Sequence, residues 1–352
     1  MAYRVIQWST GNVGGYALRV IIGHPELELA GLWVHSAAKA GRDAGELCGV
    51  GPVGVAATDD AEALLSLDAD CVCYTATGDR RPFEAVKDIA RILASGKNVV
   101  SCSVVGLVHP KSLHADITNQ LEDACRQGQS SFLTSGIDPG FANDTLPLVL
   151  SGLCERWEKI RILEIINYAT YDQPEVLFDI MGFGKPLDHT PILLMPGALG
   201  FGWGGTVRLL AEGLGVALDE VREVHERRPA TKEIKIGSHV VEPGTTGALR
   251  FEVQGIVGGR AAIVVEHVTR LDDDLAPEWP TGNGSYRVLI KGSPGMKCEF
   301  EFWDEQGDHA VGGVLLTATR LVNAIPAVCE AKPGLLSALD LPLITGRGLL
   351  RA

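Results

Sequence analysis

The chain lacks the cysteine spacing that typically holds a metal ion. No two cysteines are separated by two residues, and none clusters with histidine at the spacing of a metal site. The eight cysteines are scattered, several within apolar runs: Cys48, Cys71, Cys73, Cys102, Cys125, Cys154, Cys298 and Cys329. We therefore expect reduced thiols, as in a cytoplasmic protein, and no metal site.

Positive charge is scarce as well. The chain has 31 lysine and arginine residues against 44 acidic residues, a net charge of −13, and its basic residues form no local cluster. A surface that follows a phosphate backbone needs such a cluster. Nucleic acid is therefore not expected as a partner.

Long apolar runs are also missing. The sequence has no apolar stretch of roughly 18 residues, the length that spans a membrane. Its first eight residues have the pattern of a strand and not of a basic leader. We expect a soluble protein without membrane contact, long enough for about two domains.

The first part of the chain alternates short apolar runs with helical patterns. This alternation is typical of βαβ units and predicts a doubly wound parallel sheet, the Rossmann arrangement. Expected strands are 5–8, 29–34, 70–75, 98–101 and 131–134, and expected helices are 14–22, 59–67, 84–94 and 113–125.

Beyond Leu150 the pattern changes to longer strands and hairpins. Gly258 and Gly259 form a two-residue turn between strands 249–257 and 261–269, and a second hairpin is expected around 292–295. We expect an α+β domain on a mostly antiparallel sheet, with helices near 175–181 and 206–214. The uncharged segment 190–207 is expected to be a buried loop or a mobile apolar wall of a substrate pocket. A last helix is expected over 313–324, followed by a tail that Pro326 and later prolines interrupt.

A glycine-containing turn follows the first expected strand and opens a helix. Such a turn lets the helix N-terminus approach a pyrophosphate, so it predicts a dinucleotide site. Serine stands where the G-x-G-x-x-G pattern has its first glycine, and its hydroxyl is a candidate phosphate ligand. The residues of this predicted site are Ser9, Thr10, Gly11, Asn12, Val13 and Gly14.

The end of the second strand lacks the carboxylate that usually binds the ribose of NAD. His35 and Ser36 occupy this place, and Lys39 and Arg42 follow. These side chains favour a 2′-phosphate and predict a preference for NADP(H), with NAD(H) still possible. The alternative is that Lys39 and Arg42 belong only to a solvated loop.

Small polar residues follow two further strands of the expected sheet. Because ligands bind outside the carboxyl ends of such strands, we expect these residues to flank the ribose and nicotinamide. They are Thr75, Ala76, Thr77, Ser101, Cys102 and Ser103.

Several motifs along nearly the whole chain resemble those of a known family. They are Arg4–Trp8 leading into Thr10–Gly14, Asp43–Leu47, Gly136–Phe141 and Thr317–Pro326. The chain is similar to the dihydrodipicolinate reductase-like superfamily, and within it to 2,4-diaminopentanoate dehydrogenase and native amine dehydrogenases. Those enzymes reversibly deaminate an amine to a ketone with NAD(P).

The resemblance also implies a domain organisation. It implies a dinucleotide-binding domain over 1–142, a substrate domain over 143–312 whose sheet forms a homodimer, and a C-terminal helix and tail over 313–352 that pack back on the first domain.

Two features depart from the family pattern. The His-His pair of true dihydrodipicolinate reductases is absent, which disfavours their activity. The glutamate that amine dehydrogenases carry shortly after the fifth strand is replaced by Val104 or Val105. Valine cannot transfer a proton, so another acid or a different substrate is expected.

Other proton-transfer candidates lie in the linker and second domain. They are Asp138, Tyr168, Tyr171 and Asp172, each of which has a structural alternative, such as a turn cap for Asp138. We expect an NAD(P)H-dependent oxidoreductase acting on C=O or C=N of an apolar small molecule. The alternative is a cofactor-binding regulatory protein that has lost catalysis.

Overall fold

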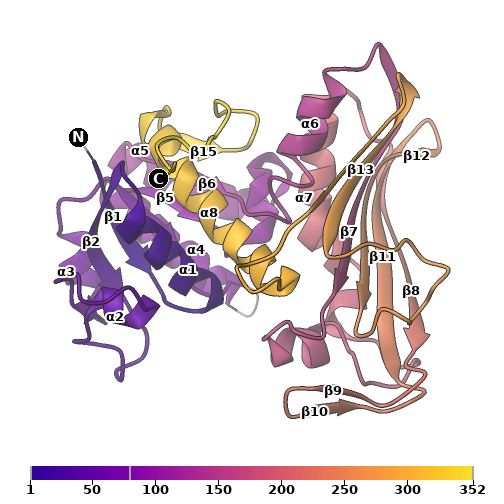
Figure 1. The fold of residues 1–352 in the computed structure, drawn as a ribbon. Coiled ribbons are helices and arrows are strands. Elements are labelled where there is room, and N and C mark those ends of the chain that lie inside the picture. The colour runs from indigo at the N-terminus through magenta and orange to yellow at the C-terminus, as the bar shows by residue number, and fades with distance from the viewer. Residues whose placement is uncertain (1, 79–80, 351–352) are drawn as a thin grey trace. The chain divides into compact units, whose positions relative to one another are not determined.

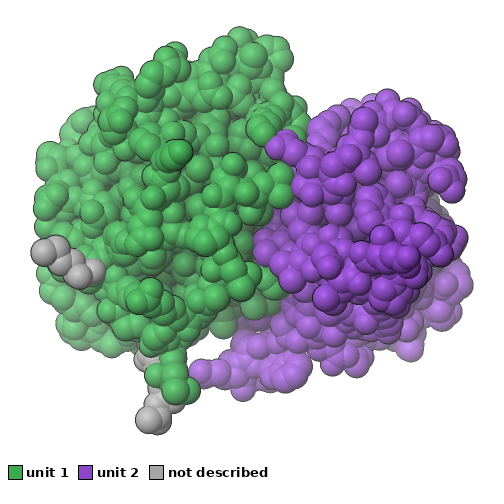
Figure 2. All heavy atoms as spheres, turned by 90° about the horizontal axis from the view of Figure 1, so that it is seen from above, with its two compact units in different colours: residues 1–141, 314–352 green, residues 142–313 purple. Residues whose placement is uncertain are grey.

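In the computed structural model, which describes residues 2–78 and 81–350, the first unit is built on a parallel sheet of seven strands (Figure 1). This unit comprises residues 1–141 and 314–352, shown in green in Figure 2. The strand order is β15-β6-β5-β4-β1-β2-β3, which contains the 3-2-1-4-5-6 order of dinucleotide-binding folds. The strands are β1 Tyr3–Trp8, β2 Leu27–Trp33, β3 Ala57–Thr58, β4 Cys71–Tyr74, β5 Asn98–Ser101, β6 Ser131–Thr134 and β15 Gly334–Leu336.

Helices cover both faces of this sheet, as the Rossmann prediction requires. Side chains of α3, α4 and α5 share one apolar cluster with Ile6, Val72 and Val99. Side chains of α1 and α8 share another with Val5 and Val100. The bounds are α1 Asn12–Gly23, α2 Ala44–Cys48, α3 Ala61–Leu65, α4 Pro82–Ala94, α5 Ala115–Gly128 and α8 His309–Glu330, with short 3-10 turns η1 Val105–Val108 and η2 Pro110–Ser112.

The C-terminal helix differs from the expectation. α8 runs from His309 through Pro326 to Glu330, whereas the sequence predicted a helix over 313–324 that ends before this proline. The reason is packing: Ile325 and Val328 on either side of Pro326 are fully buried, and this burial outweighs the lost backbone hydrogen bond.

α8 is also long and apolar enough to cross a membrane, and it is the one such helix among the described residues. Its buried side chains belong to the core of the first unit. A core helix passes the same test of length and composition, so we interpret its apolar character as core packing.

The second unit, residues 142–313, is entirely described and contains a six-stranded sheet in the order β14-β13-β7-β12-β11-β8. Neighbouring strands are antiparallel except β7 and β12, so the expected mostly antiparallel sheet is confirmed. The strands are β7 Arg156–Asn167, β8 Glu220–Pro229, β11 Thr246–Val257, β12 Arg260–Arg270, β13 Ser285–Ser293 and β14 Met296–Glu301, and a small hairpin joins β9 Ile234–Ile236 to β10 His239–Val241.

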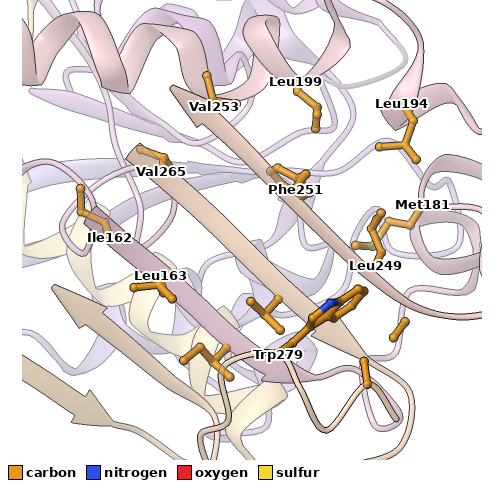
Figure 3. Packing of buried hydrophobic residues seen from close by; sticks show 14 of the residues in the cluster. Ile162, Leu163, Met181, Leu194, Leu199, Leu249, Phe251, Val253, Val265 and Trp279 are labelled. Atoms are coloured by element: carbon orange, nitrogen blue, oxygen red, sulfur yellow. The ribbon is translucent and has the colours of Figure 1, made fainter. Parts of the chain in front are cut away.

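Short helices and one long helix complete this unit. They are α6 Thr145–Ser151, a π-helical turn η3 Glu175–Ile180, a 3-10 turn η4 Ile192–Leu194 and α7 Ala198–Gly213. Leu194 and Leu199 pack in one apolar cluster with the strand residues Phe251 and Val253 (Figure 3).

Much of segment 190–207 is helical, contrary to the expected loop. α7 begins at Ala198, although its first turns contain several glycines, which are poor helix formers. A contact from β8 explains the early start: the Glu223 carboxylate accepts hydrogen bonds from the N–H groups of Gly197 (3.1 Å) and Gly200 (2.6 Å). This acceptor satisfies N–H groups that otherwise lack partners at a helix N-terminus.

Candidate functional site

A buried glutamine side chain is hydrogen-bonded to the turn between β1 and α1. The Gln7 side chain donates hydrogen bonds to the Ser9 carbonyl oxygen and to Thr75 Oγ1, both at 2.8 Å. Ser9 has a φ of 82°, a left-handed conformation that glycine adopts most readily. The serine therefore keeps the backbone geometry expected of the first glycine of the fingerprint.

The start of α1 fits a pyrophosphate. Gly11 is the N-cap residue and has no side chain to compete with a ligand for the N–H groups of the first turn. A Cβ atom on Gly11 would meet nothing within 4 Å, so this edge of the turn is open. At Gly14 a Cβ atom would lie 2.4 Å from the Ser9 carbonyl oxygen, so the turn packs against the helix only with glycine there.

Basic and polar residues follow β2. Lys39 donates from Nζ to the Thr10 carbonyl oxygen (3.2 Å) and to Thr10 Oγ1 (2.9 Å), which places an ammonium group at the turn. His35, Ser36 and Arg42 are exposed.

The first carboxylate after β2 is engaged in local structure. The backbone N–H groups of Val53, Gly54 and Gly45 bond to the Asp43 carboxylate and hold the pKa of Asp43 below its ordinary value. Asp43 thereby caps α2. Its oxygens bond within this loop, so Asp43 is not available to accept a hydrogen bond from a ribose hydroxyl.

Residues after β4 and β5 connect these two strand ends. Thr75 Oγ1 donates to the Trp8 carbonyl oxygen (3.0 Å), and Ser103 Oγ donates to the Ala76 carbonyl oxygen. The Ser103 N–H in turn donates to Ser101 Oγ at 3.0 Å. Thr75, Ser101 and Ser103 therefore order the carboxyl edge of the sheet. Thr77 is exposed, and Ala76 and Cys102 are half-buried.

The position of the expected family glutamate is apolar. Val104 is 3% exposed and lies in the same core cluster as Val99 and Leu107. Val105 begins the turn η1 and is half-buried. Neither side chain can donate or accept a proton.

Asp138 lies in the loop after β6, within the first unit. An α8 side chain holds this loop, because Thr317 Oγ1 accepts a hydrogen bond from the Ile137 N–H at 3.3 Å. Asp138 itself is half-buried, and its role remains a prediction.

In the second unit, one transverse row of residues crosses the sheet in register. Glu164 of β7 pairs with Tyr286 of β13 on one side and with His267 of β12 on the other. Phe251 of β11 pairs with His267, and the exposed His225 of β8 pairs with Phe251. We call this row the Glu164 row; its side chains share one face because paired residues point to the same side of a sheet.

The buried Glu164 carboxylate contacts three side chains of the second unit. His267 Nδ1 lies 3.2 Å from Oε1, and the hydroxyls of Tyr168 and Tyr286 donate to Oε1 (2.9 Å) and Oε2 (2.7 Å). Burial alone would raise the pKa of Glu164, but the charge and hydrogen bond of His267, together with the two hydroxyls, hold it below its ordinary value. Glu164 is therefore an ionised carboxylate on a buried face of the sheet.

Aromatic rings fix the imidazole of His267. Phe251 stacks on it with 4.5 Å between ring centroids, and the Trp203 ring of α7 lies edge-on at 4.6 Å. Nearby, Tyr171 stacks on Tyr168 at 4.8 Å.

The candidates that the sequence predicted in this unit differ in whether they lie near Glu164. Tyr168 contacts Glu164 directly and Tyr171 contacts Tyr168, whereas Asp172 is exposed. Sequence reasoning missed Glu164, His267 and Tyr286. The sequence does indicate Glu164 as unusual, because this glutamate interrupts the apolar run Ile162–Ile166.

The chain is similar to known dehydrogenases. A family model described as the 2,4-diaminopentanoate dehydrogenase C-terminal domain matches residues 141–348. An amine dehydrogenase from Streptomyces virginiae is 44% identical over 351 residues, which cover 98% of each chain. A 2,4-diaminopentanoate dehydrogenase from Acetoanaerobium sticklandii is 22% identical over 82% of this chain and 78% of its own.

A solved structure shares the fold across its full length. The structure of an amine dehydrogenase from Mycobacterium smegmatis superposes with a TM-score of 0.79 and covers 98% of this chain and 97% of its own, at 18% identity. The α/β fold predicted from the sequence is thus confirmed.

Proposed function

The chain belongs to the family of 2,4-diaminopentanoate dehydrogenase and amine dehydrogenases, and from this premise we propose that it interconverts an amine with the corresponding imine or ketone. It is an NAD(P)-dependent oxidoreductase. The observation that carries the assignment is the turn from Ser9 to Gly14, whose left-handed serine and glycine-lined helix start fit a pyrophosphate. When bound, the nicotinamide supplies or accepts a hydride at the substrate carbon.

Within this activity we propose that NADP(H) is preferred over NAD(H). Lys39 places a positive charge at the turn, Arg42 is exposed after β2, and Asp43 is committed to capping α2. A cofactor 2′-phosphate would therefore meet the positive charges of Lys39 and Arg42, and the Asp43 carboxylate would not compete for them.

Side-by-side fluorescence titrations with NADPH and NADH test this preference. We expect Arg42→Ala to weaken NADPH binding about tenfold and to leave NADH binding unchanged, because one charge-assisted hydrogen bond is lost. Arg126→Ala on α5 is the control, since Arg126 is an exposed arginine paired with Asp123. An unchanged ratio of the two affinities in Arg42→Ala would contradict the preference.

We propose an apolar substrate for this reaction. The neutral residues Val104 and Val105 offer no carboxylate that would attract a second ammonium group. Segment 190–207 carries no charge and exposes Ile192, Met195 and Phe201. A panel of ketones with ammonium, and of amines in the reverse direction, tests the proposal. Turnover restricted to polar diamines or amino acids would count against it, and cofactor binding without any turnover would favour a regulatory role.

We further propose a cytoplasmic homodimer assembled through the sheet of the second unit. The eight described cysteines are free thiols, which suits a reducing compartment. Analytical ultracentrifugation tests the assembly, with an expected mass twice the 37.5 kDa of the chain. A 37.5 kDa species at micromolar concentration would contradict it.

A further inference from the structure

The reaction proposed above requires a proton-transfer group that the first unit does not offer at the family position. Amination of a ketone passes through a carbinolamine, which must lose its oxygen as water before the carbon is reduced. A positioned acid accelerates such a step by about 10²–10⁴. Val104 and Val105 cannot serve.

We propose that His267 transfers this proton and that Glu164 positions its imidazole. This inference rests on the proposed function, because it names the residue that moves protons in that reaction. His267 acts on the substrate, and Glu164 acts through His267.

The surroundings of Glu164 support a functional role for this residue. Alternate residues of a strand share a face, so Ile162 lies on the same face as Glu164, and its neighbours in register are Val288 and Val265. Packing alone would be served by an apolar side chain at position 164 as well. Removing a carboxylate from water is energetically unfavourable, and buried carboxylates with specific charged partners cluster at functional sites.

The hydrogen bonds divide the roles between the two residues. Both Glu164 oxygens already accept bonds, from Tyr286 at Oε2 and from Tyr168 and His267 at Oε1. The carboxylate is thus suited to orient an imidazole and to stabilise its protonated form. With Nδ1 directed at Glu164, Nε2 is the ring atom that exchanges a proton with the substrate.

The protonated imidazole gives its Nε2 proton to the carbinolamine oxygen, the C–O bond breaks, and water leaves. The nitrogen lone pair forms the C=N bond, which gives an iminium ion and a neutral imidazole. In the oxidative direction, the neutral imidazole takes a proton from the water that adds to the iminium carbon.

Substitution of His267, with a matched control in the same row, tests the assignment. The probe reaction is amination of cyclohexanone by ammonium with NADPH. We expect His267→Asn to lower kcat/KM about 10²–10³-fold. His225→Asn makes the same change at the exposed end of the row and is expected to stay within about threefold of wild type, as typical of surface substitutions.

An isotope effect separates proton transfer from a distorted site. With deuterium at the transferred position of the cofactor, a slower proton transfer leaves the isotope effect on kcat/KM of His267→Asn at or below the wild-type value. Misplaced reactants slow the hydride step itself and enlarge the effect. A loss smaller than about 100-fold, or an enlarged isotope effect, overturns the proposal.

A spectroscopic measurement tests the positioning role without relying on turnover. In ¹⁵N-histidine spectra of the wild-type protein, neutral His267, assigned by its absence in His267→Asn, is expected to carry its proton on Nδ1. Glu164→Gln, which keeps the side-chain size, is expected to shift the tautomer population and to lower kcat/KM at least about tenfold. A wild-type His267 protonated on Nε2 instead overturns the proposal even if a variant fails to fold.

These measurements also distinguish a failure of the proposed function from a failure of the His267 assignment. A wild-type protein that turns over no amine or ketone contradicts the proposed function. An active wild type whose His267→Asn variant behaves like His225→Asn contradicts only the assignment of His267.

Discussion

Single residues of the second sheet show that buried carboxylates can have different roles. Glu266 is adjacent to His267 in β12, but it points to the opposite face, where its carboxylate contacts the guanidinium groups of Arg161 and Arg250. The Glu266 side chain is fully buried. Glu164 instead has an imidazole and two hydroxyls around it. Paired charges of the first kind hold a structure together, whereas neutral and titratable partners suit proton transfer.

At this scale we predict that Glu266→Gln lowers the free energy of unfolding by about 3 kcal/mol, because two guanidinium groups lose a buried counter-charge. Urea unfolding provides the measurement. Glu220→Gln is the control, since Glu220 and Arg222 form an ion pair that is about half exposed, and a change below about 1 kcal/mol is expected there. Equal losses in the two variants would argue against a structural role for the buried pair.

Among the secondary-structure elements, the β1–α1 turn requires glycine at one position. A side chain at Gly14 would collide with the Ser9 carbonyl oxygen, whereas a side chain at the next residue, Gly15, would meet nothing within 4 Å. The two neighbouring glycines of one helix therefore provide a matched pair of positions.

We predict that Gly14→Ala weakens NADPH binding at least about tenfold, because the turn must move away from the helix start that receives the pyrophosphate. Gly15→Ala is expected to keep the affinity and to stabilise the protein by up to about 1 kcal/mol, since alanine is the better helix former. Fluorescence titration and thermal unfolding of both variants supply the comparison. Unaltered NADPH binding in Gly14→Ala would disprove the role given to this close contact.

At the scale of the whole molecule, acidic residues outnumber basic ones by 44 to 31, and several carboxylates are stabilised in their charged form. The Arg287 hydrogen bond is the largest of the effects that lower the pKa of Glu299 from an ordinary 4.5 to about 2. The pKa values of Glu164 and Glu252 are lowered too, as the hydrogen bonds and charges of their partners outweigh burial.

These shifts predict how stability depends on pH. A carboxyl group with a lower pKa in the folded state contributes its full stabilisation above the unfolded value. It loses this contribution as the pH falls through the folded value. We therefore expect the free energy of unfolding to decline between about pH 5 and pH 2, measured by urea unfolding.

Glu299→Gln isolates one contribution to this decline. Acidification also relieves the repulsion of the net negative charge, which affects wild type and variant alike. The variant is expected to start with a lower free energy of unfolding and to fall less steeply over the same range. Parallel curves for the two proteins would show that Glu299 has no part in the acid transition.

The sequence predicted the architecture well where local signals carry the information. Alternating apolar runs and helical periodicity give the βα units, and a glycine-containing turn between the first strand and helix gives the dinucleotide fingerprint, because these patterns are encoded by residues close together in the chain. It predicted less where tertiary contacts override propensity: α7 starts early because Glu223 of β8 caps it, and α8 passes Pro326 because its flanking side chains are buried.

The sequence by itself therefore determined the order of elements and the glycine-containing turn between the first strand and the first helix. Only the tertiary structure decided the Glu164 row and the seventh strand, β15, of the first sheet. His267 and Tyr286 lie 103 and 122 residues from Glu164 along the chain. They meet only because strand pairing sets their register, and register depends on packing of whole strands and not on any local pattern.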